Sequence, residues 1–469
     1  MPSLLSRNLQ KRASLRAIRS VTGLASSWSA WRHDFETQKV LPHFRVSKSR
    51  RILFTLGAIN ELLQLKLTKI KAVIMKDLEK FIEIYKNIFH EDITYKNLDL
   101  TNNCIGALNN NQFDTFRRNF IERLQRLSNI FSSDPHSYNE LKKKVKDIGH
   151  ETGYKWSGPY AELVALDYWS SFNNIKDIQF VVKDKVDKMP DSIAKNIGKD
   201  ELDLDLKFIL HFNEVYMDVK SFIPTHIELS DRIIEEVKKK LGSKEEYLLG
   251  IEHLRGGNYL LTKKDLEEEL KSKKLIDELC NSIQAKKNNL EYTCASGNSY
   301  FFRLAYPDQK GRSILFTEDS YDPYLSASNN KYKALEYYKK LLINEPSFIV
   351  FVSNPWFNRE MIGNLSNSNE TFYRSFSRRA FIEFKNDDSI FDIRYPNLLV
   401  KNISEKITGI IFIEDESITN KNVDIYKTYI YLNPNCTNTK MTRNDFEILA
   451  WGGRQNYPVI IEDFENDNY

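Results

Sequence analysis

Chemically useful side chains are concentrated between Asp203 and Lys220, where two alternating segments flank a short polar break. This alternation predicts two antiparallel strands joined by a turn, each with a polar and an apolar face. The polar faces carry Asp203, Asp205 and Lys207 in the first strand and Tyr216, Asp218 and Lys220 in the second. The apolar face of the first strand carries Leu204, Leu206 and Phe208. Carboxylates and an ammonium gathered on one face can hold a divalent metal and assist hydrolysis.

The length of the turn decides whether the two polar faces lie on the same side of the sheet. A four-residue turn over 211–214 pairs Leu210 with Val215, and any turn of even length keeps the polar faces together. In this register the carboxylates of Asp205 and Asp218 are diagonal neighbours, about 7–8 Å apart at the backbone. Two carboxylates at one end of an apolar hairpin cost stability unless their charge is compensated. We therefore expect one divalent cation between them, with Asp203 as the alternative to Asp205 on the same face.

The spacing of Asp205 and the tripeptide 218–220 resembles the PD-(D/E)xK nuclease superfamily, whose fold many restriction enzymes share. That family usually has a glutamate on an upstream helix, and Glu162 stands at the corresponding place here. The proline that commonly precedes the first acidic residue is absent, and an aspartate replaces the commoner glutamate of the second motif. The resemblance covers residues 160–221 by specific positions and residues 151–435 loosely.

The resemblance implies an Mg²⁺-dependent endonuclease, with Mn²⁺ as a substitute, that leaves 5′-phosphate and 3′-hydroxyl ends. Metal held by carboxylates can activate a water molecule and neutralise the charge that develops on the phosphorus centre. The implied metal ligands are Asp205, Asp218 and the Val219 carbonyl, with Glu162 in support at the same ion or a second one. Lys220 is expected to orient or deprotonate the attacking water, or to offset negative charge.

The charge of the chain is distributed unevenly. The formal net charge is +4 over 469 residues, yet residues 1–51 carry eleven Lys and Arg against two acidic residues. A basic arm on a mildly acidic remainder predicts a polyanionic partner, and we expect nucleic acid, with DNA favoured over RNA. The candidate phosphate contacts are Arg12, Arg16 and Arg19 in the arm, and the polar face of a helix over 113–131, which carries Arg117, Arg118, Arg123 and Arg126.

Several classes of protein are disfavoured by composition. The four cysteines form no CxxC or Cys/His cluster, which indicates free thiols in a reducing compartment and argues against a zinc site. No run of eighteen apolar residues occurs, so no membrane span is expected. A bacterial cytoplasmic protein is favoured. The alternative is a mitochondrial one, because the first 33 residues lack acids and are rich in Arg and Ser.

The expected architecture is α/β: a restriction-endonuclease-like mixed sheet flanked by helices, with an N-terminal helical domain. The predicted divisions are a basic helical region over 1–150, a nuclease core over 151–437 with an insertion at about 228–330, and an extension over 438–469. Helices are predicted over 58–89, 113–131, 228–241, 263–286, 331–342 and 372–384. Further strands are predicted over 178–182, 347–353, 407–413 and 428–432, with the sheet ending near Asn433.

The function that these expectations favour is a DNA nuclease, plausible as a restriction or anti-phage defence effector. Two alternatives stay open: a non-catalytic nucleic-acid-binding protein on a nuclease fold, and an organellar genome-maintenance nuclease. A homodimer, or a partner subunit of a defence system, is the expected assembly because cutting both strands usually needs two active sites.

Overall fold

The computed structural model describes fourteen stretches of the chain. They are 79–93, 103–151, 155–185, 201–223, 225–242, 248–252, 263–306 (except 296 and 298), 323–341, 345–354, 368–391, 398–418, 425–436, 441–450 and 459–461. The chain divides into two compact units, Met1–Lys69 and Ile70–Tyr469, and every described residue belongs to the second. Of the helix predicted over 58–89, only residues from 79 onwards are described, and 79–89 are helical.

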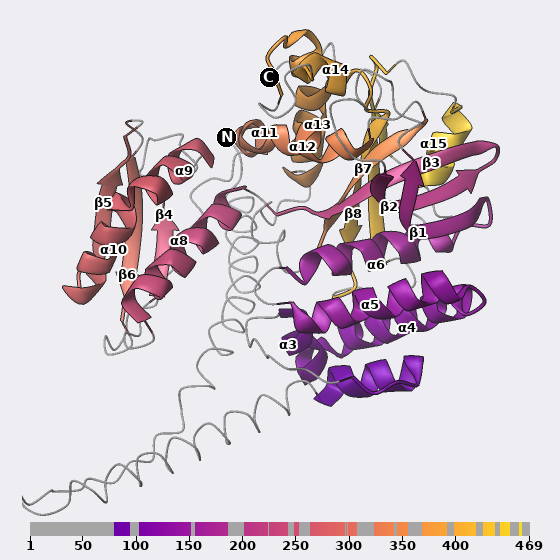
Figure 1. Cartoon of the computed structure of the whole chain (residues 1–469), viewed down its shortest axis with the longest axis horizontal. Helices are drawn as coiled ribbons and strands as arrows, with labels where there is room; N and C mark the ends of the chain where they lie inside the picture. Colours follow the sequence, from indigo (N-terminus) through magenta and orange to yellow (C-terminus); the bar gives the residue numbers. More distant parts are fainter. Residues whose placement is uncertain are drawn as a thin grey trace, which may run out of the picture. The chain divides into compact units, whose positions relative to one another are not determined.

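A seven-stranded mixed sheet organises this unit, in the order β1-β2-β3-β7-β8-β9-β10 (Figure 1). The strands are β1 (Ile175–Lys185), β2 (Glu201–Leu210), β3 (Asn213–Ser221), β7 (Ser347–Ser353), β8 (Gly409–Asp415), β9 (Tyr426–Leu432) and β10 (Val459–Ile461). Strands β1, β2 and β3 pair antiparallel, and β3, β7 and β8 run parallel. Strand β9 returns antiparallel to β8, and β10 pairs parallel with β9. The predicted α/β class is confirmed, whereas the sheet continues beyond Asn433 because β10 adds a strand.

Helices cover both faces of the sheet, which explains the unbroken apolar runs of its central strands. The first core joins one face to helices α3 (Asn103–Asn109), α4 (Asp114–Phe131), α5 (Pro135–His150), α6 (Ser157–Ser170) and α15 (Arg443–Ala450). The second core joins the other face to α11 (Pro323–Asn330), α12 (Tyr332–Tyr338), η4 (Lys339–Leu341), α13 (Ser368–Phe381) and α14 (Val400–Ser404). Within β7, Phe348, Val350 and Val352 belong to the first core, and Ile349 and Phe351 belong to the second.

Helix α6 is the element that links the sheet to the helical layer. It contacts β3 on one side and α4 and α5 on the other, so it lies between them (Figure 1). Ten of its fourteen residues are buried, which accounts for a sequence that is apolar nearly all round. A helix held on both sides has a fixed rotation, and any polar side chain that it directs at the sheet is therefore held in place.

A separate group of elements lies between β3 and α11 in the sequence. It consists of α8 (Thr225–Leu241), β4 (Leu248–Glu252), α9 (Lys263–Ser272), α10 (Lys274–Gln284), β5 (Asn289–Thr293) and β6 (Ser299–Ala305), and its sheet has the order β4-β6-β5. Its buried residues form a third core of their own. The single helix predicted over 263–286 is wrong, because Lys273 adopts a left-handed conformation (φ 58°) that separates α9 from α10.

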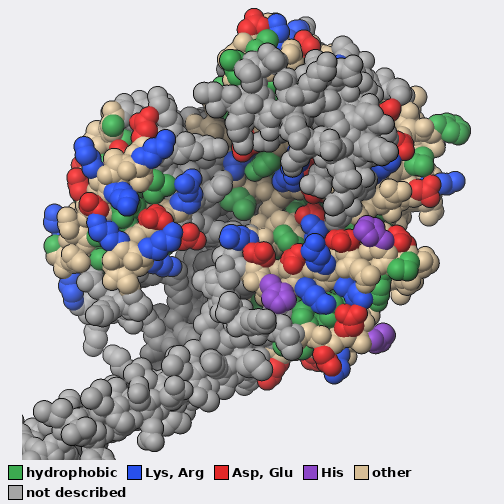
Figure 2. Space-filling view, in the orientation of Figure 1, with side chains coloured by type: hydrophobic (Ala, Val, Ile, Leu, Met, Phe, Trp, Pro, Cys, Tyr) green, Lys and Arg blue, Asp and Glu red, His purple; other side chains and the backbone are tan. Residues whose placement is uncertain are grey.

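Among the residues that the structure describes, no helix is both long and apolar enough to cross a membrane. On the face shown in Figure 2, Lys and Arg side chains are interspersed with Asp and Glu.

Candidate active site on strands β2 and β3

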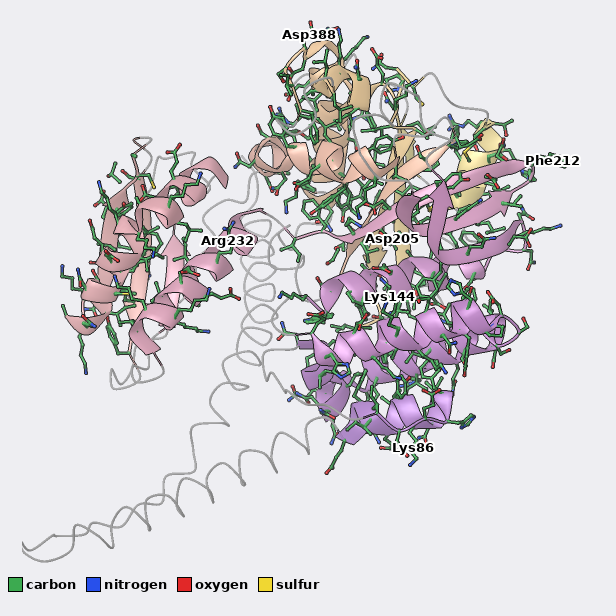
Figure 3. The ribbon with its side chains drawn as sticks, viewed as in Figure 1. Lys86, Lys144, Asp205, Phe212, Arg232 and Asp388 are labelled. Carbon is green, nitrogen blue, oxygen red and sulfur yellow. The ribbon has the colours of Figure 1, made fainter. Side chains whose placement is uncertain are left out.

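The hairpin that carries the predicted site has a shorter turn than expected. The paired residues run from Leu206 with Met217 to Leu210 with Asn213, which leaves only His211 and Phe212 as the connection. The predicted four-residue turn and the pairing of Leu210 with Val215 are therefore wrong. Two is also an even number, so both polar faces still lie on one side of the sheet, as predicted. His211 adopts a positive φ of 52°, and Phe212 at the tip is fully exposed (Figure 3).

Asp205 lies where the two strands separate. The last hydrogen-bonded pair at this end of the hairpin is Leu206 with Met217, and Asp205 and Asp218 are the next residue along each strand. The Val219 N–H donates to Asp205 Oδ2 at 2.8 Å, so a side chain accepts the bond that a neighbouring strand would otherwise take. The side chains of β2 also change faces at this point. Leu204 packs in the second core, whereas Leu206, two residues later, packs in the first. The observed register therefore sets Asp205 beside Asp218, and not beside Lys220 as the four-residue turn predicted.

Lys220 joins the two carboxylates. Its Nζ lies 2.8 Å from Asp205 Oδ2, 2.8 Å from Asp218 Oδ1 and 3.0 Å from the Val219 carbonyl oxygen. An ammonium has three N–H donors, and these three acceptors match that number. The predicted convergence of Asp205, Asp218, Lys220 and the Val219 carbonyl is therefore present in the fold.

The two carboxylates differ in environment. The Asp218 side chain is fully buried, and burial together with the neighbouring Asp205 charge raises the pKa of Asp218 to about 7. Burial acts in the same direction on Asp205, but Lys220, a hydrogen bond with Asp218 and the charge of Lys340 together outweigh burial and hold the pKa of Asp205 below its usual range. Asp218 Oδ2 is buried and meets no donor among the described residues. A buried carboxylate oxygen without a donor is a costly feature that calls for a ligand or a proton.

Glu162 approaches the pair from α6. Burial, and then the charge of Asp205, raise the pKa of Glu162 to about 7, while the Lys144 ammonium at 2.5 Å from Glu162 Oε2 opposes both. Lys144 lies on α5, in the helical layer, whereas Asp205 lies on the sheet (Figure 3). The charges of Glu162 on α6 and Asp205 on β2 therefore influence each other, and the supporting role of Glu162 at the metal stays a prediction.

Two lysines of the site were not predicted from the sequence. Lys144 pairs with Glu162, and Lys340 on η4 lies 3.6 Å from Asp218 Oδ1. Each is one of several lysines in its own segment, so neither spacing nor composition could single it out. The prediction for Asp203 cannot be compared in the same way, because its side chain lies outside the described ones.

The donor set fits a single hard cation that keeps most of its water. Across the described residues, no three His, Cys, Asp or Glu side chains form a group placed to hold a metal ion. Mg²⁺ commonly takes only one or two carboxylates from the protein, and Asp205, Asp218 and the Val219 carbonyl oxygen provide that number. The orphaned Asp218 Oδ2 would gain a partner from such an ion. At present the Lys220 ammonium occupies the position between the two carboxylates.

The predicted phosphate contacts divide into three cases. Arg12, Arg16 and Arg19 lie outside the described residues. Arg117 is half-buried and holds local structure, because it donates to the Leu108 carbonyl at 2.9 Å and pairs with Asp114. The prediction for Arg123 is wrong, because its side chain is fully buried, and Arg126 donates to both oxygens of Asp167. Arg118 is exposed on α4.

Comparison with known proteins gives no relative. The chain matched no protein-family model, no curated protein and no solved structure.

Proposed function

We propose that the protein is a metal-dependent nuclease that hydrolyses phosphodiester bonds, with DNA as the favoured substrate. One observation carries the proposal: two opposed carboxylates on adjacent strands share a single lysine at 2.8 Å each, and one buried carboxylate oxygen has no donor among the described residues. Such a pair binds a proton or a cation, and it lies next to an ammonium that can act on a substrate.

The roles of the residues follow from their contacts. A divalent ion such as Mg²⁺, when bound, would neutralise phosphate charge and supply an activated water. Asp205, Asp218 and the Val219 carbonyl would hold it. Lys220 would then exchange its carboxylate partners for the attacking water or a phosphate oxygen, since its three donors now serve those ligands. Glu162 would support the ion or its water from α6.

The arrangement of strands supports the restriction-endonuclease-like fold that the resemblance implies. An antiparallel β1–β2–β3 meander carries both acidic residues and the lysine, and β7 then pairs parallel with β3. A role in restriction or anti-phage defence, in the bacterial cytoplasm and as a homodimer or partner subunit, rests on the resemblance alone. The organellar alternative predicts removal of the N-terminal segment on import.

The test uses the purified full-length chain with supercoiled plasmid, linear duplex, single-stranded DNA and RNA, each with Mg²⁺, with Mn²⁺ and with EDTA. We expect metal-dependent cleavage that EDTA abolishes. A protein that retards these nucleic acids on a gel but cleaves none of them with either metal is the non-catalytic binding protein, and the proposal is then wrong.

A further inference from the structure

Lys340 is the most exposed charged group at the carboxylate pair. Its side chain is 44% exposed, compared with 21% for Lys220 and 0% for Asp218. It therefore stands on the solvent side of the pair, where an approaching anion first meets the site. Its positive charge reaches both carboxylates, since it also acts to lower the pKa of Asp205.

The backbone that presents Lys340 is held firmly on both sides. Tyr338, two residues earlier, is fully buried and donates from its hydroxyl to the Lys406 carbonyl at 2.5 Å, with Ser347 as a second partner. Leu341, the next residue, is fully buried in the second core. The intervening segment η4 contacts both β2 and β3. The position of Lys340 is thus set by neighbours that are fixed in the core, while its own side chain is partly exposed beside Asp218.

Lys220 and Lys340 are engaged differently. The three donors of Lys220 are matched by Asp205, Asp218 and the Val219 carbonyl. Lys340 Nζ lies 3.6 Å from Asp218 Oδ1, which is an ion-pair distance and too long for a hydrogen bond. Its attraction to Asp218 is therefore weaker, and a partly exposed ion pair of this kind is easily exchanged for another anion.

Lys340 adds a positive charge at the place where a substrate phosphate would enter. Three carboxylates surround the site, and a phosphodiester brings one further negative charge. Lys220 and Lys144 are each already close to a carboxylate, at 2.8 and 2.5 Å. Of the lysines described at the site, only Lys340 combines proximity with exposure.

We propose that Lys340 binds a non-bridging oxygen of the phosphate that is to be cleaved. The ligand is the phosphodiester backbone of a nucleic-acid strand, and the inference rests on the proposed function. The proposal also gives a role to η4, which follows the third-core elements and precedes β7 in the sequence. Through Lys340, η4 adds a substrate contact to the site formed by β2 and β3.

The experiment compares Lys340→Gln and Lys340→Arg with Lys331→Gln as the matched control. Lys331 directly precedes α12, whereas Lys340 follows it, and Lys331 pairs with Glu383, which is not one of the site carboxylates. Oligonucleotide binding is measured by fluorescence anisotropy over a range of salt, with Ca²⁺ in place of Mg²⁺ because Ca²⁺ takes oxygen ligands with looser geometry. Single-turnover cleavage is measured with Mg²⁺, and circular dichroism checks the fold of each variant.

We expect Lys340→Gln to reduce the slope of log K against log salt by about one, the loss of one phosphate contact. Cleavage should fall roughly 10²-fold, and Lys340→Arg should recover most of it. A methylphosphonate at the mapped cleavage position removes the phosphate charge, so it should weaken wild-type binding but add little to Lys340→Gln.

The outcomes separate the two proposals. If the wild type cleaves and Lys340→Gln matches Lys331→Gln in slope and rate, Lys340 is not a phosphate ligand, while the nuclease proposal stands. If no variant cleaves but the slope falls only for Lys340→Gln, the phosphate contact stands and the hydrolytic function does not. If neither cleavage nor a change in slope is seen, both proposals fail.

Discussion

Two groups of buried charges lie in the same folded unit and are built differently. The Arg123 cluster links α4, α6, β8 and β9, and consists of Arg123, Tyr160, Asp167, Asp415 and Tyr426. The carboxylate site on β2 and β3 consists of Asp205, Asp218 and Lys220, with Glu162, Lys144 and Lys340 around it.

In the Arg123 cluster every buried side-chain oxygen and nitrogen has a partner among the described residues. The Arg123 guanidinium, fully buried, donates to the Tyr426 and Tyr160 hydroxyls at 3.0 and 3.1 Å and to Asp415 at 3.3 Å. The same hydroxyls donate onward to Asp167 and Asp415, at 2.5 and 2.6 Å. Nothing in this cluster is left to bind a ligand, and its connections between distant elements indicate a structural role.

The carboxylate site is incomplete by the same standard. Asp218 Oδ2 meets no donor among the described residues, burial raises the pKa of Asp218 to about 7, and the flanking Lys340 is partly exposed. A buried polar group whose atoms all have hydrogen-bond partners holds elements together. A buried carboxylate with one oxygen that lacks a donor can instead bind a proton or a cation. The two clusters should therefore respond to mutation in opposite ways.

The largest effect on activity is expected from Lys220→Met. Loss of the ammonium that joins the carboxylates should reduce cleavage by about 10²- to 10⁴-fold, the range for removal of one general acid–base or charge-stabilising group. Lys207→Met on the neighbouring strand β2, whose lysine pairs with Glu214 at 3.0 Å, is the control and should retain most of the rate. Plasmid cleavage under single-turnover conditions measures both. Equal rates for Lys220→Met and the wild type would remove Lys220 from the chemistry.

The largest effect on stability is expected from Arg123→Met. This change leaves Asp415 and the two hydroxyls buried without their cation, and breaking a buried pair in this way costs about 3–5 kcal/mol. Urea denaturation followed by circular dichroism should show the loss, while the cleavage rate per folded molecule should stay close to that of the wild type. If Arg123→Met instead abolished cleavage at full stability, the contrast between a structural and a functional cluster would collapse.

The strands of the site could be predicted well from the sequence, because their residues either alternate between apolar and polar or form an unbroken apolar run. Strand β7 was predicted over the same residues that form it, and β2 and β3 were placed within a few residues of their ends. The small sheet β4-β6-β5 was missed because strands such as β5, Asn289–Thr293, are short and of mixed polarity. Five such residues resemble a loop as much as a strand.

The turn and the outlying lysines depend on contacts that are distant in sequence. The two-residue turn contains no glycine or Asn-Gly signal, and His211 at its positive φ contacts Asp445 on α15, with Nδ1 2.5 Å from Oδ1. Lys144 and Lys340 reach the site only because α5 packs on α6 and η4 packs on β2 and β3. Local sequence patterns predict whether a segment forms a helix or a strand. These contacts depend instead on which helices and strands pack together in the fold.

A smaller effect, on stability, should distinguish the two members of the carboxylate pair. A folded-state pKa of about 7 for Asp218 lies above the ordinary value, so its protonation stabilises the fold at low pH, and this contribution is lost as pH rises through about 7. Asp218→Asn should therefore be more stable than the wild type at pH 8, by up to about 4 kcal/mol for three pKa units, but inactive.

Asp205→Asn is the matched control, and it should act in the opposite direction. The pKa of Asp205 is lowered, so its ionised form stabilises the fold at pH 8, and the asparagine loses the ion pair with Lys220. Thermal unfolding at pH 5 and pH 8 measures both variants. A fall in stability for both at pH 8 would mean that Asp218 is held as firmly as the carboxylates of the Arg123 cluster.

The smallest effect expected is on the pH dependence of metal binding. Mg²⁺ must compete with the proton on Asp218, because a metal ligand has to be deprotonated. Below pH 7 the apparent affinity should fall by up to about tenfold per pH unit, equivalent to 1.4 kcal/mol, and above pH 8 it should become constant. Isothermal titration calorimetry at several pH values, in buffers of different ionisation enthalpy, gives the affinity and counts the released protons. Binding in Asp218→Asn should be weak at every pH. A wild-type affinity unchanged between pH 6 and pH 8 would show that the ion, if bound, does not use Asp218, and the unmet oxygen would then be a structural cost without a ligand to offset it.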